Sequence, residues 1–364
     1  MADITLSWDR NWSDVDGRGN PGSHFDRIYL NDYDLTLDFG SGAGNNSFTC
    51  LAIVAKTGGG ATCTGRVILA RATTVINADL QAGHETLLSV GSGEAVDVHG
   101  TVTGGSGAAG RHGISVASGG TLYATTVIGG ATAGSYGVYV NGGTVTIYAA
   151  SGAGTAVGCY VASGEATVSG ADGDTADAVY VAGGTVEVTA YAKGTTTGEG
   201  VHANGGTLTV AEALGESGGY GVRLSGAATA TITSTTGGYG DGAHGVYVYG
   251  PSCICTVGTA KGGTHARAKG VVLVLGTLTV NGTDLSGVGH PVGLAGTLKI
   301  GGGVRLEFQD ASGDPKIFYG PDAQPAEADV RDGTDYGYGD YTGSMATGGS
   351  VPAPVIGRNI MRRA

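Results

Sequence analysis

Short runs of alternating apolar and polar residues recur along most of the chain, and each pair of runs is joined by a glycine-containing corner. In the segment GVYVNGGTVTI, residues 137–147, Val138 and Val140 share one face while Tyr139 points the other way. After the corner, Val145 and Ile147 again share a face. A period of two predicts half-buried β-strands. The phrase returns with substitutions at residues 177–188, 199–210 and 269–280.

The residue before the first apolar position of each phrase marks a regular repeat. Successive markers lie 20 to 25 residues apart, a spacing typical of solenoids. A propeller blade needs a longer repeat, and the framework of leucine-rich repeats is missing. The markers are Gly113, Gly137, Gly158, Ala178, Gly200, Gly221, Gly245, Gly270 and Gly293.

If the two runs of a phrase paired as a hairpin, each pair would need a core of its own. If the corner instead turns the chain sideways, each strand stacks on its counterpart one repeat later, and the inward valines and isoleucines fill one core. The sequence therefore predicts an all-β parallel β-helix, with adjacent coils about 4.8 Å apart. The coils are longer than the three hexapeptides of left-handed helices, so we expect a right-handed one. Residues 28–98 read as earlier, less regular coils.

Stacking also predicts two columns of outward side chains. The first strands contribute Ser115, Tyr139, Tyr160, Tyr180, His202, Arg223, Tyr247 and Val272. The second strands contribute Tyr123, Thr146, Thr167, Glu187, Thr209, Thr231, Ile254, Thr279 and Lys299. We interpret these as a tyrosine ladder and a threonine ladder that stack on themselves. Packing of a partner protein on the tyrosines and stacking of sugars remain alternatives.

The cysteines fit a reduced core. Cys159, Cys253 and Cys255 fall at inward positions and replace small apolar residues. Cys253 and Cys255 lack a second ligand pair, which disfavours a metal site. Cys50 and Cys63 form the one pair that neighbouring coils could bring together as a disulfide.

Composition narrows the class of protein. The chain of 364 residues has 73 glycines without a triplet period, which excludes collagen, and 41% hydrophobic residues, which disfavours disorder. A net charge of −12 and a pI near 4.9 disfavour nucleic acid as a partner. No apolar run is long enough for a membrane span, and the first residues, MADITLSWDR, lack the pattern of a signal peptide.

The pattern predicts no active site. Glu187, His202 and Arg223 lie in consecutive coils, but Glu187 belongs to a different strand, and the other two form no acid–base pair. DGDTAD, residues 172–177, is expected to be a solvated turn, and DVDGRGN, residues 14–20, lacks the pattern of a calcium loop. We therefore expect a protein that is not an enzyme, with no cofactor and no metal.

Both ends differ from the repeat. Residues 1–30 hold both tryptophans and are predicted to form an aromatic N-terminal cap on a solenoid of residues 31–308. Residues 309–364 are rich in glycine, proline and tyrosine and lack periodicity, which predicts an extended C-terminal tail for docking or assembly. The expected contact residues are Tyr139, Tyr160, Tyr180 and Tyr247 on the solenoid, and Tyr319, Tyr336, Tyr338, Tyr341, Val351 and Ile356 in the tail.

Two segments carry a resemblance to known proteins. Asn11, Trp12, Pro21 and Asp26 resemble the opening of β-helical surface and phage proteins, and ADVRDGTDYGYGDYTGSM, residues 328–345, is similar to the ends of phage virion proteins and planctomycete solenoid proteins. The resemblance implies a structural subunit of a virion, such as a tail fibre, spike, head fibre or capsid-decorating protein. Such a subunit would be made in the host cytoplasm.

The expected partners are other copies of the chain, as a homo-oligomer such as a trimer or filament, and other structural proteins of the assembly. One alternative is a tailspike that binds or depolymerises cell-surface polysaccharide. Another is an extracellular filament or adhesin subunit at the cell surface.

Overall fold

The structure is a computed structural model of the chain. It describes residues 2–6, 10–11, 25–31, 33–37, 47–54, 66–69, 72–83, 85–105, 110–284, 292–294, 297–300, 305–309 and 315–319. Strands dominate these residues, and no α-helix occurs among them. In this described part, no helix is long and apolar enough to cross a membrane.

The strands belong to a single sheet, in which a strand generally pairs with the one two places further along the chain. The first nine are β1 (Ala2–Thr5), β2 (Arg10–Asn11), β3 (Phe25–Tyr29), β4 (Leu35–Leu37), β5 (Ser47–Val54), β6 (Val67–Leu69), β7 (Thr73–Gln81), β8 (Leu88–Val90) and β9 (Ala95–Thr103). The central ones are β10 (Ile114–Ala117), β11 (Thr121–Ile128), β12 (Val138–Ser151), β13 (Cys159–Gly173), β14 (Val179–Val181), β15 (Thr185–Gly194), β16 (Val201–Ala203), β17 (Thr207–Gly215), β18 (Val222–Leu224), β19 (Thr229–Thr236), β20 (Val246–Val248) and β21 (Ile254–Lys261). The last are β22 (Val271–Leu273), β23 (Thr277–Val280), β24 (Thr283–Asp284), β25 (Val292–Leu294), β26 (Thr297–Ile300), β27 (Arg305–Gln309) and β28 (Pro315–Tyr319).

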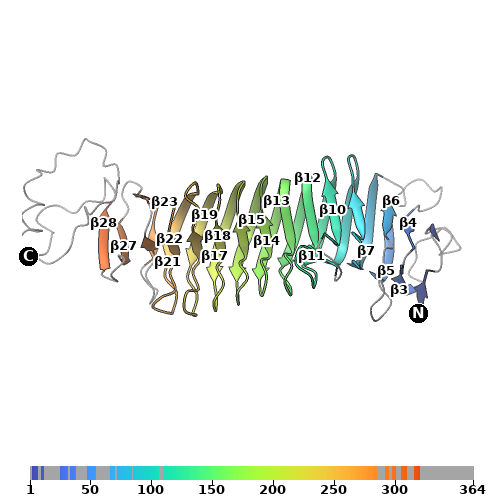
Figure 1. The fold of residues 1–364 in the computed structure, drawn as a ribbon, viewed down its shortest axis with the longest axis horizontal. Coiled ribbons are helices and arrows are strands. Elements are labelled where there is room, and N and C mark those ends of the chain that lie inside the picture. Colours follow the sequence, from blue (N-terminus) through green and yellow to red (C-terminus); the bar gives the residue numbers. More distant parts are fainter. Residues whose placement is uncertain are drawn as a thin grey trace, which may run out of the picture.

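Apart from β28, the described strands pair in parallel with their counterparts one coil away, as the alternation predicts. Val138 lies opposite Ile114 on one side and Cys159 on the other, and Val145 lies between Leu122 and Ala166. The stack forms a β-solenoid of about 10 turns, in which the described strands follow one another along a rod (Figure 1). The predicted parallel solenoid is confirmed, while its right-handed winding stays a prediction.

One core runs through the described coils. Val138, Val140, Val145 and Ile147 are at most 1% exposed, and the corresponding valines of the coil at residues 179–188 are buried in the same way. The third inward position holds small residues, among them Ala150, Ala171, Ala192 and Ala213. Because every coil places its apolar residues on the same inner faces, no coil needs a core of its own.

The glycine corner has a conformational cause. Gly142 has a φ of 91°, in the left-handed region where a side chain is strained, and equivalent glycines such as Gly164 and Gly184 adopt the same conformation. At this corner the chain turns from the first strand into the second. The marker glycines have a packing role, since a Cβ on Gly137 would lie 2.5 Å from Cγ1 of Val127.

The register corrects two of the predicted alignments. Gly293 lies opposite Val272, an outward position, and is therefore not the counterpart of Gly270. Ile254 lies opposite Thr229, so Thr256, opposite Thr231, is the member of the threonine column in that coil. In each case the strand pairing, which the sequence pattern does not give, sets the alignment.

The two ends differ in how they pair. β1 and β2 already pair in parallel with β3 and β4, within the segment predicted as a cap. At the other end, β27 pairs in parallel with β25 and then antiparallel with β28, so a hairpin covers the edge of the last described coil. Residues 320–364 lie outside the described residues, and with them the predicted tail contacts at Tyr336, Tyr338, Tyr341, Val351 and Ile356.

Cys159, Cys253 and Cys255 are free and buried, as predicted. Cys159 and Cys255 are fully buried, and burial raises the pKa of each thiol to about 12. Thiols with such pKa values are inert at neutral pH. Cys63 lies outside the described residues, and the proposed pairing with Cys50 lies with it.

Candidate functional site

Two columns of side chains run side by side along the face formed by the first strands. One is the predicted outward column, in which Tyr139, Tyr160, Tyr180, His202 and Arg223 occupy successive coils. The other comes from the residue before each marker, which sequence reasoning did not single out. Backbone hydrogen bonds align this second column as His112, Tyr136, Val157, Asp177, Glu199, Tyr220, His244 and Lys269.

Aromatic rings from the two columns stack on one another. The ring centroid of Tyr136 lies 4.5 Å from that of Tyr160, and Tyr160 lies 5.1 Å from Tyr180, with interplanar angles of 10° and 5°. A second stack pairs Tyr220 with Tyr247 at 4.8 Å. The predicted self-stacking of Tyr139, Tyr160 and Tyr180 is therefore confirmed. The stacked rings are only partly exposed to solvent.

A charged cluster lies between the two stacks. Asp177 precedes β14, Glu199 precedes β16, and His202 lies within β16. Nδ1 of His202 is 3.4 Å from Oδ2 of Asp177 and 4.0 Å from Oε2 of Glu199. The side chains of these residues are only 9–17% exposed. We call Asp177, Glu199 and His202 the acid–histidine cluster.

The pKa values of the two carboxyl groups of the cluster are shifted in opposite directions. Burial, followed by the hydrogen bond to Asp177 and its negative charge, raises the pKa of Glu199 to about 8. Burial acts in the same sense on Asp177, but hydrogen bonds from His202 and Glu199 outweigh it and lower the pKa of Asp177. At neutral pH, Glu199 is therefore the protonated member of the pair and Asp177 the ionised one.

The residues around the cluster hold its members in place. Nη1 of Arg223 donates to Oε1 of Glu199 at 3.2 Å, and the backbone N–H of Glu199 donates to Oδ1 of Asp177 at 3.0 Å. Nε2 of His202 lies 3.0 Å from the hydroxyl oxygen of Ser225, which follows β18. The ring of Tyr180 meets His202 edge-on, with centroids 4.8 Å apart.

Sequence reasoning placed only part of this cluster. It aligned His202 with Arg223 correctly, and Glu187 lies exposed on a different strand, as predicted. The expectation of a solvated turn at residues 172–177 is wrong for Asp177, which is largely buried in the cluster. A register drawn for the residue before each marker would have placed Asp177 and Glu199 in adjacent coils.

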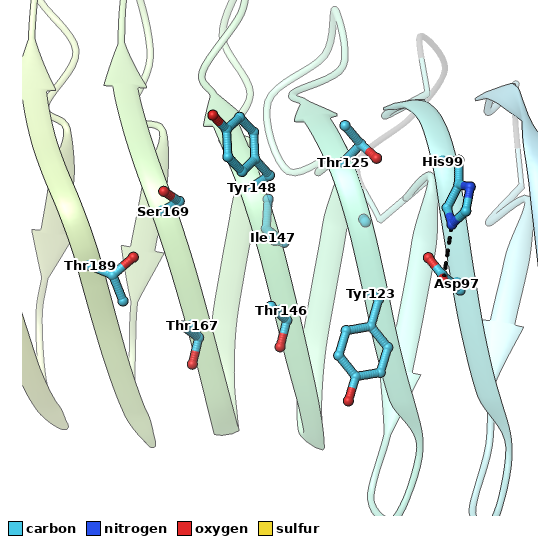
Figure 2. A pocket seen from close by; sticks show the side chains of 11 residues that line it. Asp97, His99, Tyr123, Thr125, Thr146, Ile147, Tyr148, Thr167, Ser169 and Thr189 are labelled. Atoms are coloured by element: carbon cyan, nitrogen blue, oxygen red, sulfur yellow. Dashed lines mark ion pairs between the residues drawn. The ribbon is translucent and has the colours of Figure 1, made fainter.

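The second strands present a different surface. Two outward columns rich in threonine run along it, one through Thr146 and Thr167 and one through Thr144. Over the middle coils lies a shallow trough with a volume of about 340 Å³. The rings of Tyr123 and Tyr148 are part of its lining (Figure 2). Both rings are open to solvent, at 51% and 70% exposed.

Hydroxyl groups and one ion pair complete this trough. Its floor includes Thr146, Thr167 and Ser169, while Asp97 and His99 lie at one end with Oδ2 and Nε2 3.1 Å apart (Figure 2). We call this surface the tyrosine trough. It combines two exposed aromatic rings with a row of hydrogen-bonding groups, which the self-stacked tyrosine ladder does not.

Comparisons with known proteins add no family to this picture. The chain matches no protein-family model. Neither a curated protein nor a solved structure matches it. The class defined by the fold is therefore the parallel β-solenoid.

Proposed function

We propose that the chain is a non-enzymatic structural protein, a rod-like β-solenoid subunit of a larger assembly. The observation that carries this proposal is the parallel stacking of the described strands from β1 to β27, around one core that runs from Leu6 to Val292. The tyrosine ladder also supports the proposal of a structural role, because its aromatic rings stack on and cover one another. A stack of nearest-neighbour coils is a rigid scaffold that separates two attachment points.

The particular assembly is a further step of the proposal. The resemblance of residues 11–26 and 328–345 supports a phage virion protein, which assembles through its C-terminal tail and solenoid surfaces as copies of one chain. An extracellular filament or adhesin subunit is the alternative. Electron microscopy of the full chain, together with its mass in solution, tests both. We expect discrete oligomers or filaments, and a monomer at every concentration would contradict self-assembly.

A test of enzymatic activity separates this proposal from a depolymerising tailspike. Incubation of the full chain with a panel of acidic bacterial polysaccharides should release neither reducing ends nor unsaturated products. Turnover that is abolished in a Glu199→Gln or His202→Ala variant would overturn the non-enzymatic assignment and identify the acid–histidine cluster as the active site.

Polysaccharide binding without cleavage is a second candidate function, favoured by the tyrosine trough. Exposed tyrosine rings stack on the apolar faces of sugars, and threonine and serine hydroxyl groups can bond to sugar hydroxyls. Tyr123→Ala and Tyr148→Ala should weaken binding of a polysaccharide that the wild-type chain retains. Tyr239→Ala is the matched control, because Tyr239 is 61% exposed but lies outside the trough. Equal losses in all three variants would contradict binding in the trough.

A further inference from the structure

Three ligand atoms of the acid–histidine cluster converge on one point. One potential ligand atom from each of Asp177, Glu199 and His202 lies within 4.8 Å of the other two. Ligands of a tetrahedral zinc ion, with bonds of about 2.1 Å, are roughly 3.4 Å apart. Nδ1 of His202 is already 3.4 Å from Oδ2 of Asp177 and 4.0 Å from Oε2 of Glu199. The distance from Nδ1 of His202 to Oε2 of Glu199 must shorten by about 0.6 Å, from 4.0 Å, to reach this spacing.

Each of these groups is oriented through its other polar atom. Arg223 holds Oε1 of Glu199, the backbone N–H of Glu199 holds Oδ1 of Asp177, and Ser225 lies at Nε2 of His202. Ligating histidines and carboxylates in metal sites are fixed in this manner by a second layer of hydrogen bonds. The remaining polar atoms are Oδ2 of Asp177, Oε2 of Glu199 and Nδ1 of His202, and both carboxylate oxygens lie near Nδ1.

The surroundings match a site that is sheltered but reachable. The side chain of Glu199 is 9% exposed, while those of Asp177 and His202 are 15% and 17% exposed, so solvent reaches the edge of the cluster. Tyr180 covers one side of the imidazole. Because metal ligands must be deprotonated, binding of the ion would release the proton of Glu199, and Arg223 and the ion would together balance the two carboxylates.

We propose that Asp177, Glu199 and His202 form a binding site for a divalent transition-metal ion of the zinc class, with water in the fourth position. An imidazole nitrogen with two carboxylate oxygens suits zinc or manganese. Calcium, which takes six to eight oxygen ligands, is a poorer match. The ion would tie together the coils of β14 and β16, and this inference is independent of the proposed assembly function.

A hydrolytic relay through the same residues is the weaker interpretation. Asp177, His202 and Ser225 follow the order of a carboxylate, an imidazole and a hydroxyl group. However, the hydroxyl of Ser225 also has Oδ1 of Asn204 at 3.2 Å and the carbonyl oxygen of Ala203 at 3.5 Å as acceptors. These acceptors compete with the imidazole for the hydroxyl proton, whereas a second-layer role for Ser225 needs no particular donor.

Calorimetric titration of the full chain with ZnCl₂ and with MnCl₂, after treatment with a chelator, tests the site. We expect one equivalent of zinc or manganese to bind saturably, and Glu199→Gln and His202→Ala to abolish that binding. Ser225→Ala should weaken it by about 10–100-fold, as expected for a second-layer residue. His99→Ala is the matched control, because His99 also pairs with an aspartate but has no third ligand, and it should bind as the wild type does.

A spectroscopic readout guards against misfolded variants. Co²⁺ in place of zinc should give the absorption bands of a four- or five-coordinate site in the wild-type chain and in His99→Ala, and none in Glu199→Gln, which is nearly isosteric. The proposal is overturned if no saturable binding occurs, if calcium alone binds, or if Glu199→Gln binds zinc as tightly as the wild-type chain while retaining its fold.

Discussion

Nδ1 of His112 accepts a hydrogen bond from the backbone N–H of Tyr136, one coil further along, at 3.3 Å, and the two rings stack 5.1 Å apart. The same contact recurs at equivalent positions. Nδ1 of His244 accepts from the backbone N–H of Lys269 at 3.1 Å, and Asp177 accepts from that of Glu199. A side chain in the position before the marker therefore joins successive coils, and this requires an unprotonated acceptor.

Acid should loosen these two histidine contacts. Burial, followed by the charge of Arg111, lowers the pKa of His112 from 6.5 to about 4, and burial followed by the charge of Lys269 does the same for His244, against the opposing effect of Asp241. The unfolded chain therefore binds more protons below pH 6.5. The stability contributed by neutral imidazoles is full above about pH 6.5 and is lost as the pH falls toward 4. Allowing for solvent screening, we expect about 1–2 kcal/mol for each histidine.

Urea unfolding at pH 7.5 and pH 4.5 measures this loss. The double variant His112→Asn, His244→Asn keeps an acceptor atom near the position of each Nδ1 but does not titrate. It should lose less stability between the two pH values than the wild-type chain. An identical loss in both proteins would show that other groups, and not these imidazoles, cause the pH dependence.

A charge in the core should destabilise the solenoid strongly. Val181 is fully buried on β14 and packs in the continuous core. Val181→Asp should lower the free energy of unfolding by about 3–5 kcal/mol, because a carboxylate there has no partner. Thr231→Asp, at an exposed position of β19 whose strand neighbours are Thr209 and Thr256, is the control and should change it by less than about 0.5 kcal/mol. Thermal unfolding followed by circular dichroism compares them, and similar losses would contradict the assigned inward face.

Gly142 should resist substitution for a conformational reason. Its φ of 91° lies in the left-handed region, and an added Cβ would lie 3.2 Å from Cβ of Ser118. Gly142→Ala should therefore cost about 1–2 kcal/mol of stability. In Gly91→Ala the added Cβ meets only the flexible side chain of Glu94, at 3.3 Å, and φ is not left-handed. The difference between the two unfolding free energies isolates the strain, and equal values would refute it.

The terminal hairpin should protect the end of the rod from association. β28 pairs antiparallel along β27, which otherwise presents an unpaired strand edge. A chain that ends after Phe308 removes β28 and should fold, because its coils are intact, yet aggregate end to end. A chain that ends after Tyr319 retains the hairpin and is the control. Light scattering over a range of concentrations measures both, and equal association would show that the hairpin does not shield the edge.

The sequence alone determined the repeating part of the fold. The alternation of apolar and polar residues determined which side chains face inward, as at Val138 and Val140. Separate hairpins would each need a core of their own, so the sequence predicted stacked coils that share one core. A side chain that recurs at one position in successive coils must lie above its counterpart, so the stacking of Tyr139 on Tyr160 followed directly. These conclusions depend only on local period and on the burial of apolar surface.

Tertiary structure decided what the turns do. Glycine-rich turns vary in length, so Ile254 and Gly293 took positions that counting could not assign. Asp177 and Glu199 occupy the same column as Tyr136 and His244. Because these residues differ in type, no recurring residue in the sequence indicated that they form a column. Backbone hydrogen bonds between coils set that alignment. The acid–histidine cluster exists because they bring Asp177, from the preceding coil, to 3.4 Å from Nδ1 of His202, whose own coil also contributes Glu199.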